Sequence, residues 1–130
     1  MIAGIGVDVV TLSRISNTHE RFGERFARRI LSDEEMIEYA VSKTPERFLA
    51  KRFAVKEAAV KALGTGERVG VLLKDFSLTH DKLGKPGLHI TDKAALRCQH
   101  DGIIFSHVSL SDEGDTVVAF VVLERNSQSG

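Results

Sequence analysis

The feature that most constrains this sequence is the run KRFAVKEAAVKAL at positions 51–63. In an α-helix each residue advances by about 100 degrees, which distributes the apolar side chains of this run nearly all round the axis. A helix without a clean polar face is expected to be buried. Glu57 and Lys61 lie one turn apart within it, where uncompensated charge is costly. The rest of the chain must therefore fold around this helix and supply partners for both residues.

Capping residues and glycines set the expected boundaries of the elements. The pair Thr44-Pro45 begins the long helix, which Gly64 should end, and Ser32 with Glu35 forms a capping box that begins another helix. The expected helices cover residues 14–30, 33–42, 45–63 and 92–101, and the expected strands cover 2–10, 74–80, 87–91, 103–111 and 116–124. Turns are expected at 84–87 and 112–115. The fold class is α+β, with a mostly antiparallel sheet packed against the long helix.

Composition narrows the possible functions. The 130 residues are 42% hydrophobic, and 18 basic residues balance 18 acidic ones, which disfavours a nucleic-acid binder. The chain has neither a basic leader nor a run of roughly 18 apolar residues, so we expect a cytoplasmic protein without membrane insertion. Cys98 is the only cysteine, which excludes an intrachain disulfide and indicates a packed helix residue. We expect one domain over residues 1–125 and a polar, disordered tail at 126–130.

Charged residues on the long helix point to a phosphate-bearing ligand. Glu57 four residues before Lys61 is, by itself, the spacing of a surface ion pair that contributes roughly 0.2 to 0.5 kcal/mol. Arg52 and Lys56 have the same spacing but equal charge, so they repel each other unless an anion lies nearby. Asp8 lies on the glycine-lined face of the first strand. If Asp8 meets Glu57, two carboxylates together with water and phosphate oxygens could complete a magnesium site.

Four blocks of the sequence, in order along the chain, resemble one known family. They are GIGVDVV at 4–10 with Arg14-Ile15 after it, RFAVKEAAVKALGTG at 52–66, GKP at 84–86 and HVSLS at 107–111. Together they are similar to the holo-acyl-carrier-protein synthases, a family of 4'-phosphopantetheinyl transferases, and the second block is the most specific. Some relatives have a histidine after the last block, where this chain has Asp112, so no role of that histidine carries over.

The resemblance implies a reaction and a site. The reaction is the magnesium-dependent transfer of 4'-phosphopantetheine from coenzyme A to a serine of apo-acyl carrier protein, with release of adenosine 3',5'-bisphosphate, which activates the carrier for fatty acid biosynthesis. Asp8 and Glu57 would hold Mg²⁺, and Lys61 would neutralise phosphate charge and protonate the leaving group. Either Glu57 or a metal-bound water would accept the serine proton. The implied coenzyme A contacts are Arg52, Lys56, Lys61, Gly64, Thr65, Gly66, Lys85, Pro86, His107 and Ser109.

A stripe of arginines is the expected docking surface for the carrier protein. Arg14, Arg21, Arg25 and Arg28 fall within about 60 degrees on one helix if that helix is continuous, with Phe22 and Phe26 in an adjoining apolar strip. Taken alone, such a stripe is most often a solvated face. The resemblance favours docking of an acidic carrier protein through it. Gly23 interrupts the segment and could mark a bend.

Small size and the apolar strand at 117–123 also predict self-association, and the resemblance implies a homotrimer with active sites between neighbours. Three alternatives stay open at this point. The chain could be a non-catalytic module that docks an acidic protein, a nucleic-acid binder, or a different metal-dependent enzyme that acts on nucleotide phosphates.

Overall fold

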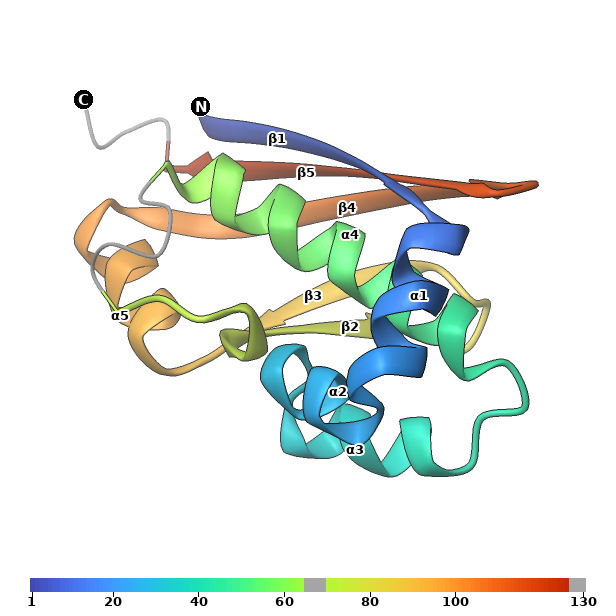
Figure 1. Cartoon of the computed structure of the whole chain (residues 1–130). Helices are drawn as coiled ribbons and strands as arrows, with labels where there is room; N and C mark the ends of the chain where they lie inside the picture. The colour runs from blue at the N-terminus through green and yellow to red at the C-terminus, as the bar shows by residue number, and fades with distance from the viewer. Residues whose placement is uncertain (65–69, 127–130) are drawn as a thin grey trace.

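The computed structural model describes residues 1–64 and 70–126, which form two antiparallel sheets around one long helix (Figure 1). In chain order the elements are β1 (Ile2–Thr11), α1 (Leu12–Phe22), α2 (Glu24–Ile30), α3 (Asp33–Ala40), α4 (Pro45–Leu63), the short 3-10 helix η1 (Leu73–Asp75), β2 (Phe76–His80), β3 (Pro86–Ile90), α5 (Asp92–His100), β4 (Ile103–Glu113) and β5 (Thr116–Arg125).

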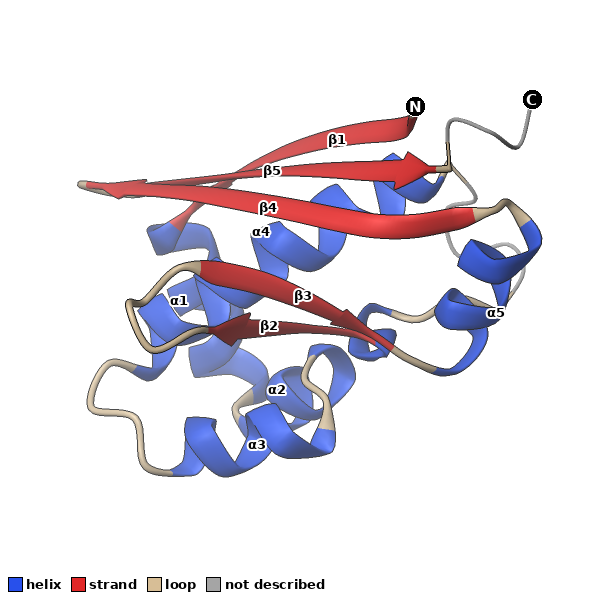
Figure 2. Ribbon diagram, turned by 180° about the vertical axis from the view of Figure 1, so that it is seen from behind, coloured by secondary structure: helices blue, strands red, loops and turns tan. Residues whose placement is uncertain are grey.

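Both sheets pack against helix α4. Strands β1, β5 and β4 form a three-stranded sheet in that order, and β2 with β3 forms a separate hairpin; every one of these pairings is antiparallel. Helix α4 runs along one face of the three-stranded sheet, and the β2–β3 hairpin continues beside β4, so that α4 lies in front of the strands in Figure 1 and behind them in Figure 2. The side chains that α4 contributes to the core include Leu49, Ala50, Ala54, Val55, Ala58 and Ala59, all without exposed surface. The predicted α+β class and the buried long helix are confirmed.

The predicted helix over residues 14–30 is wrong as a single helix. Gly23 adopts φ 56° and ψ −132°, a conformation that interrupts a helix, so the segment folds as α1 and α2. Because the two helices have separate axes, the four arginines do not share one face. Arg14 and Arg21 belong to α1, whereas Arg25 and Arg28 belong to α2.

Most other boundaries differ from the predicted ones by one or two residues. The capping box at α3 is present, because the Glu35 amide donates to Ser32 Oγ at 3.3 Å while Glu35 Oε1 accepts from the Ser32 amide at 3.1 Å. The strand expected at 74–80 begins only at Phe76, because residues 73–75 form η1. Strand β4 extends to Glu113, which shortens the last turn to Gly114-Asp115.

The outer face of the three-stranded sheet carries apolar side chains. On β1, the glycine face is covered by α4, and the opposite face exposes Ile5, Val7 and Val9 with fractions of 59%, 51% and 60%. Val7 lies beside Phe120 of β5, which is also exposed. Among the described residues, no helix combines the length and the apolar character that a membrane crossing requires.

Candidate active site

Two glycines of β1 bring the strand unusually close to α4. A Cβ atom at Gly4 would lie 1.9 Å from the Ala62 carbonyl oxygen, and one at Gly6 would lie 2.0 Å from the Ala58 carbonyl oxygen. No side chain fits in that space, so glycine at both positions permits the contact. The strand and the helix run antiparallel here, since Gly4 meets Ala62 whereas Gly6 meets Ala58. Asp8 follows on the same face of β1. Its carboxylate therefore lies beside α4.

Asp8 binds Lys61 across this contact. The Lys61 ammonium donates to Asp8 Oδ1 at 3.0 Å and to the Val7 carbonyl oxygen at 3.1 Å. The Asp8 side chain is 15% exposed, whereas that of Lys61 is 55% exposed, so the ammonium stays accessible from solvent. Glu57 is half-buried and precedes Lys61 by one turn on the same side of α4. The structure thus brings Asp8 of β1 into contact with Lys61, and Glu57 lies one turn before Lys61 on α4.

Glu57 also lines a cleft of about 860 Å³. The other lining residues come from α1, α2, the middle of α4 and the segment around η1: Thr18, Phe22, Arg25, Phe26, Arg28, Arg29, Ile30, Phe53, Leu72, Leu73 and Lys74. Four of these residues are cationic and three are phenylalanines. The cleft therefore joins a catalytic candidate to four of the residues predicted to dock the carrier protein. Sequence reasoning missed Phe53, Arg29 and residues 72–74, which no local pattern connects to that surface.

The residues of the predicted docking stripe are arranged more locally than one continuous helix would place them. The guanidinium carbons of Arg21 and Arg25 lie 5.2 and 5.9 Å from the centroid of the Phe22 ring, so these cations converge on one aromatic side chain across the break at Gly23. Arg28 donates to Glu24 Oε2 at 3.0 Å within α2. Its charge is thereby partly neutralised.

Two residues predicted to contact coenzyme A are instead buried. Lys56 is fully buried, and its ammonium donates to Glu35 Oε1 at 2.6 Å, to the Leu73 carbonyl at 3.3 Å and to the Phe76 carbonyl. Burial lowers the pKa of Lys56, and the Glu35 carboxylate opposes that shift. The prediction that Lys56 flanks the nucleotide phosphates is corrected by this burial.

Arg52 belongs to the same buried charge cluster. Its guanidinium lies 3.6 Å from the centroid of the Phe48 ring, within 4.0 Å of Glu35 Oε2 and 3.7 Å from Glu38 Oε2. Burial lowers the pKa of Arg52, and the two carboxylates oppose the change. The sequence predicted that Arg52 and Lys56 need a nearby anion. That anion is the Glu35 carboxylate of α3, so no ligand phosphate is needed there.

The remaining predicted contacts of coenzyme A are dispersed over the single chain. Gly64 caps α4 with φ 79°, while Thr65 and Gly66 lie outside the described residues. Lys85 and Pro86 lie where the β2–β3 turn enters β3. His107 and Ser109 are exposed on the outer face of the three-stranded sheet, where His107 Nε2 lies 2.5 Å from Glu124 Oε1. Since Asp8 lies on the inner face, one chain alone does not bring these residues together.

Asp112 has a structural partner that the sequence did not reveal. Its carboxylate binds Arg47, and its Oδ2 lies 3.4 Å from Lys51 Nζ. These contacts connect the end of β4 to the first half of α4. The two cations are 65 and 61 residues away in sequence, so no local spacing could have identified them.

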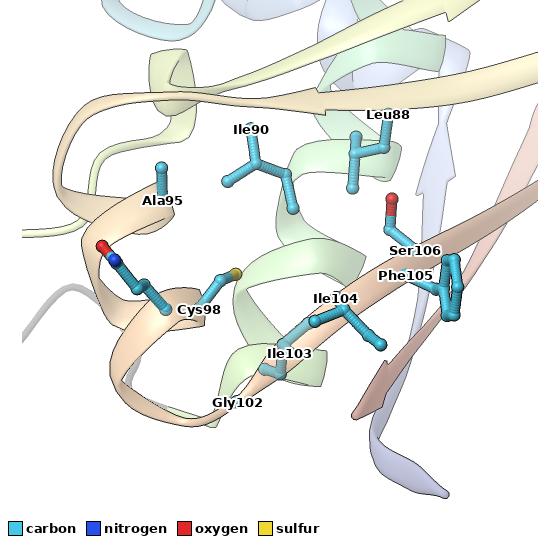
Figure 3. A pocket seen from close by; sticks show the side chains of 10 residues that line it. Leu88, Ile90, Ala95, Cys98, Gly102, Ile103, Ile104, Phe105 and Ser106 are labelled. Atoms are coloured by element: carbon cyan, nitrogen blue, oxygen red, sulfur yellow. The ribbon is translucent and has the colours of Figure 1, made fainter. Parts of the chain in front are cut away.

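A second hollow lies between β3, α5 and β4 and has a volume of about 400 Å³ (Figure 3). Its lining is mainly apolar, including Leu88, Ile90 and Ile103, and it contains none of the predicted site residues. Cys98 faces it from α5, and burial raises the pKa of this thiol. The predicted packing of Cys98 on a helix is confirmed, and the thiol is poorly suited to act as a nucleophile.

The predicted pair of carboxylates, Asp8 and Glu57, is a ligand set typical of magnesium and not of a metal held by protein alone. Within residues 1–64 and 70–126, no group of three or more histidine, cysteine, aspartate or glutamate side chains is arranged to hold a metal ion. Magnesium commonly takes one or two carboxylates and completes its shell with waters and substrate phosphates. The two carboxylates predicted from the sequence, Asp8 and Glu57, match that number.

Comparison with known proteins agrees with this fold and identifies the family. Residues 4–121 match the model of the 4'-phosphopantetheinyl transferase superfamily. The chain belongs to that superfamily, as a member of its holo-[acyl-carrier-protein] synthase family. The predicted resemblance and the enzyme class, a transferase, are thereby confirmed.

Individual relatives match along nearly their whole length. The holo-[acyl-carrier-protein] synthase of Nitrosospira multiformis is 52% identical over 125 residues, which are 96% of this chain and 100% of the relative. The crystal structure of the synthase from Neisseria meningitidis is 46% identical with a TM-score of 0.91, covering 96% of this chain and 100% of that one. The Helicobacter pylori synthase, solved in complex with coenzyme A, is 26% identical with a TM-score of 0.79, covering 92% and 99%.

Proposed function

We propose that this chain transfers 4'-phosphopantetheine from coenzyme A to a serine of apo-acyl carrier protein and releases adenosine 3',5'-bisphosphate. The observation that carries the proposal is the contact between Asp8 and Lys61, with Glu57 one turn away at the edge of a cleft lined by cations and phenylalanines. The relatives named as holo-[acyl-carrier-protein] synthases support the acceptor, and the Helicobacter pylori complex with coenzyme A supports the donor.

Asp8 and Glu57 would hold Mg²⁺ in this reaction. When bound, the ion would neutralise charge on the pyrophosphate of coenzyme A and orient it for attack. The number of carboxylates supports magnesium, since the remaining ligands would be phosphate oxygens and waters.

Lys61 would stabilise the phosphate that changes its bonding. Its ammonium has three N–H groups, and the described part of the chain accepts two of them at Asp8 and the Val7 carbonyl. A remaining N–H on a half-exposed side chain can donate to a phosphate oxygen without releasing Asp8. The serine oxygen attacks the phosphorus that bears pantetheine, and the bond from that phosphorus to the bisphosphate leaving group breaks. Glu57, or a water activated at the same site, accepts the serine proton.

The cleft beside Glu57 would receive the carrier protein. Acyl carrier proteins present an acidic helix next to the modified serine, as the family resemblance implies, and Arg21, Arg25 and Arg29 provide the opposite charge. Phe22 and Phe26 would give this surface an apolar centre, which is typical of protein interfaces. Arg14 at the start of α1 and the partly neutralised Arg28 would contribute less, mainly by steering.

The complete site would require a homotrimer. The outer sheet face exposes apolar side chains on β1 and β5, and it also carries His107 and Ser109. If that face packs against other copies, these two residues, together with Lys85 and Pro86, can reach coenzyme A bound at the Asp8 of a neighbour. This arrangement would account for the dispersion of the predicted ligand contacts over a single chain.

The decisive test combines the purified chain with apo-acyl carrier protein, coenzyme A and MgCl₂, followed by mass spectrometry of the acceptor. We expect the acceptor to gain the phosphopantetheine mass, and neither an acceptor with alanine in place of its serine nor a reaction with EDTA should show the gain. An acceptor that stays unmodified across carrier proteins would refute the proposal. Consumption of coenzyme A without any acceptor would instead indicate an enzyme acting on nucleotide phosphates.

A further inference from the structure

Lys56 and Glu35 form a buried junction between four parts of the fold. Glu35 of α3 is 1% exposed and accepts hydrogen bonds from the Ser32 amide and hydroxyl, from the Leu78 amide at 3.0 Å and from Lys56 Nζ at 2.6 Å. The Lys56 ammonium also donates to the carbonyls of Leu73 and Phe76. All three Lys56 donors are therefore committed to protein acceptors on α3, η1 and β2.

The segment from Leu72 to Phe76 is attached to α4 through this junction, while the Asp75 carbonyl accepts from the Thr91 amide at 2.8 Å and from the Thr91 hydroxyl at 3.2 Å. Its helix η1 has only three residues, and its internal bonds, between Leu72 and Asp75, stabilise a local turn without fixing where that turn lies. Among the polar contacts of the segment, the two carbonyls held by Lys56 attach it directly to α4. Helix α4 itself is held by an extensive apolar core and does not depend on one ion pair.

The same segment forms part of the cleft that contains Glu57. Leu72, Leu73 and Lys74 line it together with Phe53 and residues of α1 and α2. Lys56 and Glu57 are consecutive on α4, so their side chains point about 100 degrees apart. One side chain enters the buried junction and the other lines the cleft.

We propose that Lys56, fixed by Glu35, is a positioning residue for carrier-protein binding: it holds the carbonyls of Leu73 and Phe76 and so sets the place of the cleft wall formed by residues 72–74. This inference rests on the proposed function. It assigns Lys56 no contact with substrate, and it explains why a lysine adjacent to a catalytic candidate is fully buried.

The test uses the full-length Lys56→Met variant, which keeps the length of the side chain and removes its donors. Glu35 would retain the Ser32 and Leu78 donors, and the nearby Arg52 guanidinium would supply a countercharge. We expect faster amide hydrogen exchange at Leu72, Asp75 and Leu78. We also expect the KM for the carrier protein to rise about tenfold, with the KM for coenzyme A changed less than about twofold.

A matched control is Lys51→Met on the same helix, because Lys51 pairs with Asp112 and does not line the cleft. Its exchange at residues 72–78 and its KM for the carrier protein should equal those of the wild type. If Lys56→Met does not fold, the Glu35→Gln/Lys56→Met double variant, which removes both charges of the Lys56–Glu35 pair, replaces it and is compared with Glu35→Gln alone.

Two results would overturn the inference. The first is amide hydrogen exchange in residues 72–78 that is the same in Lys56→Met as in the wild type. The second is faster exchange without a selective effect on the carrier protein, so that its KM is unchanged or rises by the same factor as the KM for coenzyme A. A wild-type chain that modifies no carrier protein would refute the proposed function and with it the role in binding. In that case, faster exchange in the variant would still show that Lys56 holds the segment, so the two failures remain distinguishable.

Discussion

At the scale of single residues, Asp8 has a larger part in the proposed chemistry than in stability. Its partner Lys61 is half-exposed, and an ion pair of this kind contributes about 0 to 1 kcal/mol to the free energy of unfolding. The same carboxylate would be one of only two that hold magnesium. Activity and stability should therefore respond very differently to its removal.

We predict that Asp8→Asn lowers kcat/KM for carrier-protein modification by about a hundredfold or more, since it removes an anionic ligand of the proposed ion. The midpoint of thermal unfolding should fall by no more than about 5 °C. Steady-state kinetics at saturating MgCl₂ and calorimetry measure the two effects. An active Asp8→Asn enzyme would remove Asp8 from the metal site.

At the scale of elements, the contact between β1 and α4 places the catalytic candidates. It depends on the absence of side chains at Gly4 and Gly6, because backbone atoms of α4 occupy the space that a Cβ would need. Backbone atoms in a buried helix cannot move aside as a flexible side chain can. The contact is thus intolerant of the smallest addition.

We predict that Gly6→Ala destabilises the fold by about 3 kcal/mol and also lowers activity, because the strand must move away from α4. Gly87→Ala is the matched control, since its Cβ would meet only the hydroxyl of the exposed Thr79 at 2.9 Å. Urea unfolding of both variants measures the difference. Equal stabilities would mean that β1 approaches α4 less closely than described.

The break between α1 and α2 gives the proposed docking surface its shape. Arg21 and Arg25 flank Phe22 from two different helices, and Arg25 and Phe22 line the cleft. A charge reversal at these arginines should weaken binding of the acidic carrier protein more than binding of coenzyme A. Surface charges of this kind change the association rate and its salt dependence more than the stability of the enzyme.

We predict that Arg21→Glu weakens binding of apo-acyl carrier protein by about tenfold and reduces the salt dependence of binding, with a smaller effect on coenzyme A. Arg97→Glu on α5 serves as the control, because Arg97 is paired with Asp101 and does not line the cleft. Titration calorimetry at two salt concentrations gives both quantities. Equal losses in the two variants would argue for a nonspecific charge effect.

At the scale of the whole molecule, the outer face of the three-stranded sheet exposes a group of apolar side chains that a single chain does not cover. Ile5, Val7, Val9 and Phe120 are each more than 40% exposed on adjacent strands. Contiguous apolar surface of this kind marks an interface in most proteins. The proposed trimer would cover it.

We predict that the wild-type chain is a trimer and that Val7→Asp shifts it toward monomers, because burying an unpaired carboxylate in an apolar interface is costly. Activity should fall with the fraction of trimer. Light scattering coupled to size-exclusion chromatography measures the mass, with Leu96→Asp on the exposed side of α5 as control. A fully active wild-type monomer would contradict the proposed shared site.

Local pattern determined much of this protein. The buried character of α4 followed from apolar residues all round its axis, and the alternation along β1 correctly separated Asp8, Gly4 and Gly6 from Ile5, Val7 and Val9. The capping box at Ser32 located the start of α3. Each of these features depends on residues within a few positions of one another, which is the range over which backbone periodicity and capping act.

Only the tertiary structure decided which partner each charge meets. Lys56 meets Glu35, 21 residues earlier, and Asp112 meets Arg47, 65 residues earlier, so neither pairing has a signature in local spacing. The tertiary structure likewise covered the glycine face of β1 with α4 and left the apolar face exposed. Periodicity predicts which side chains share a face. Long-range contacts decide which element packs on that face and which partner each charged residue near the site meets.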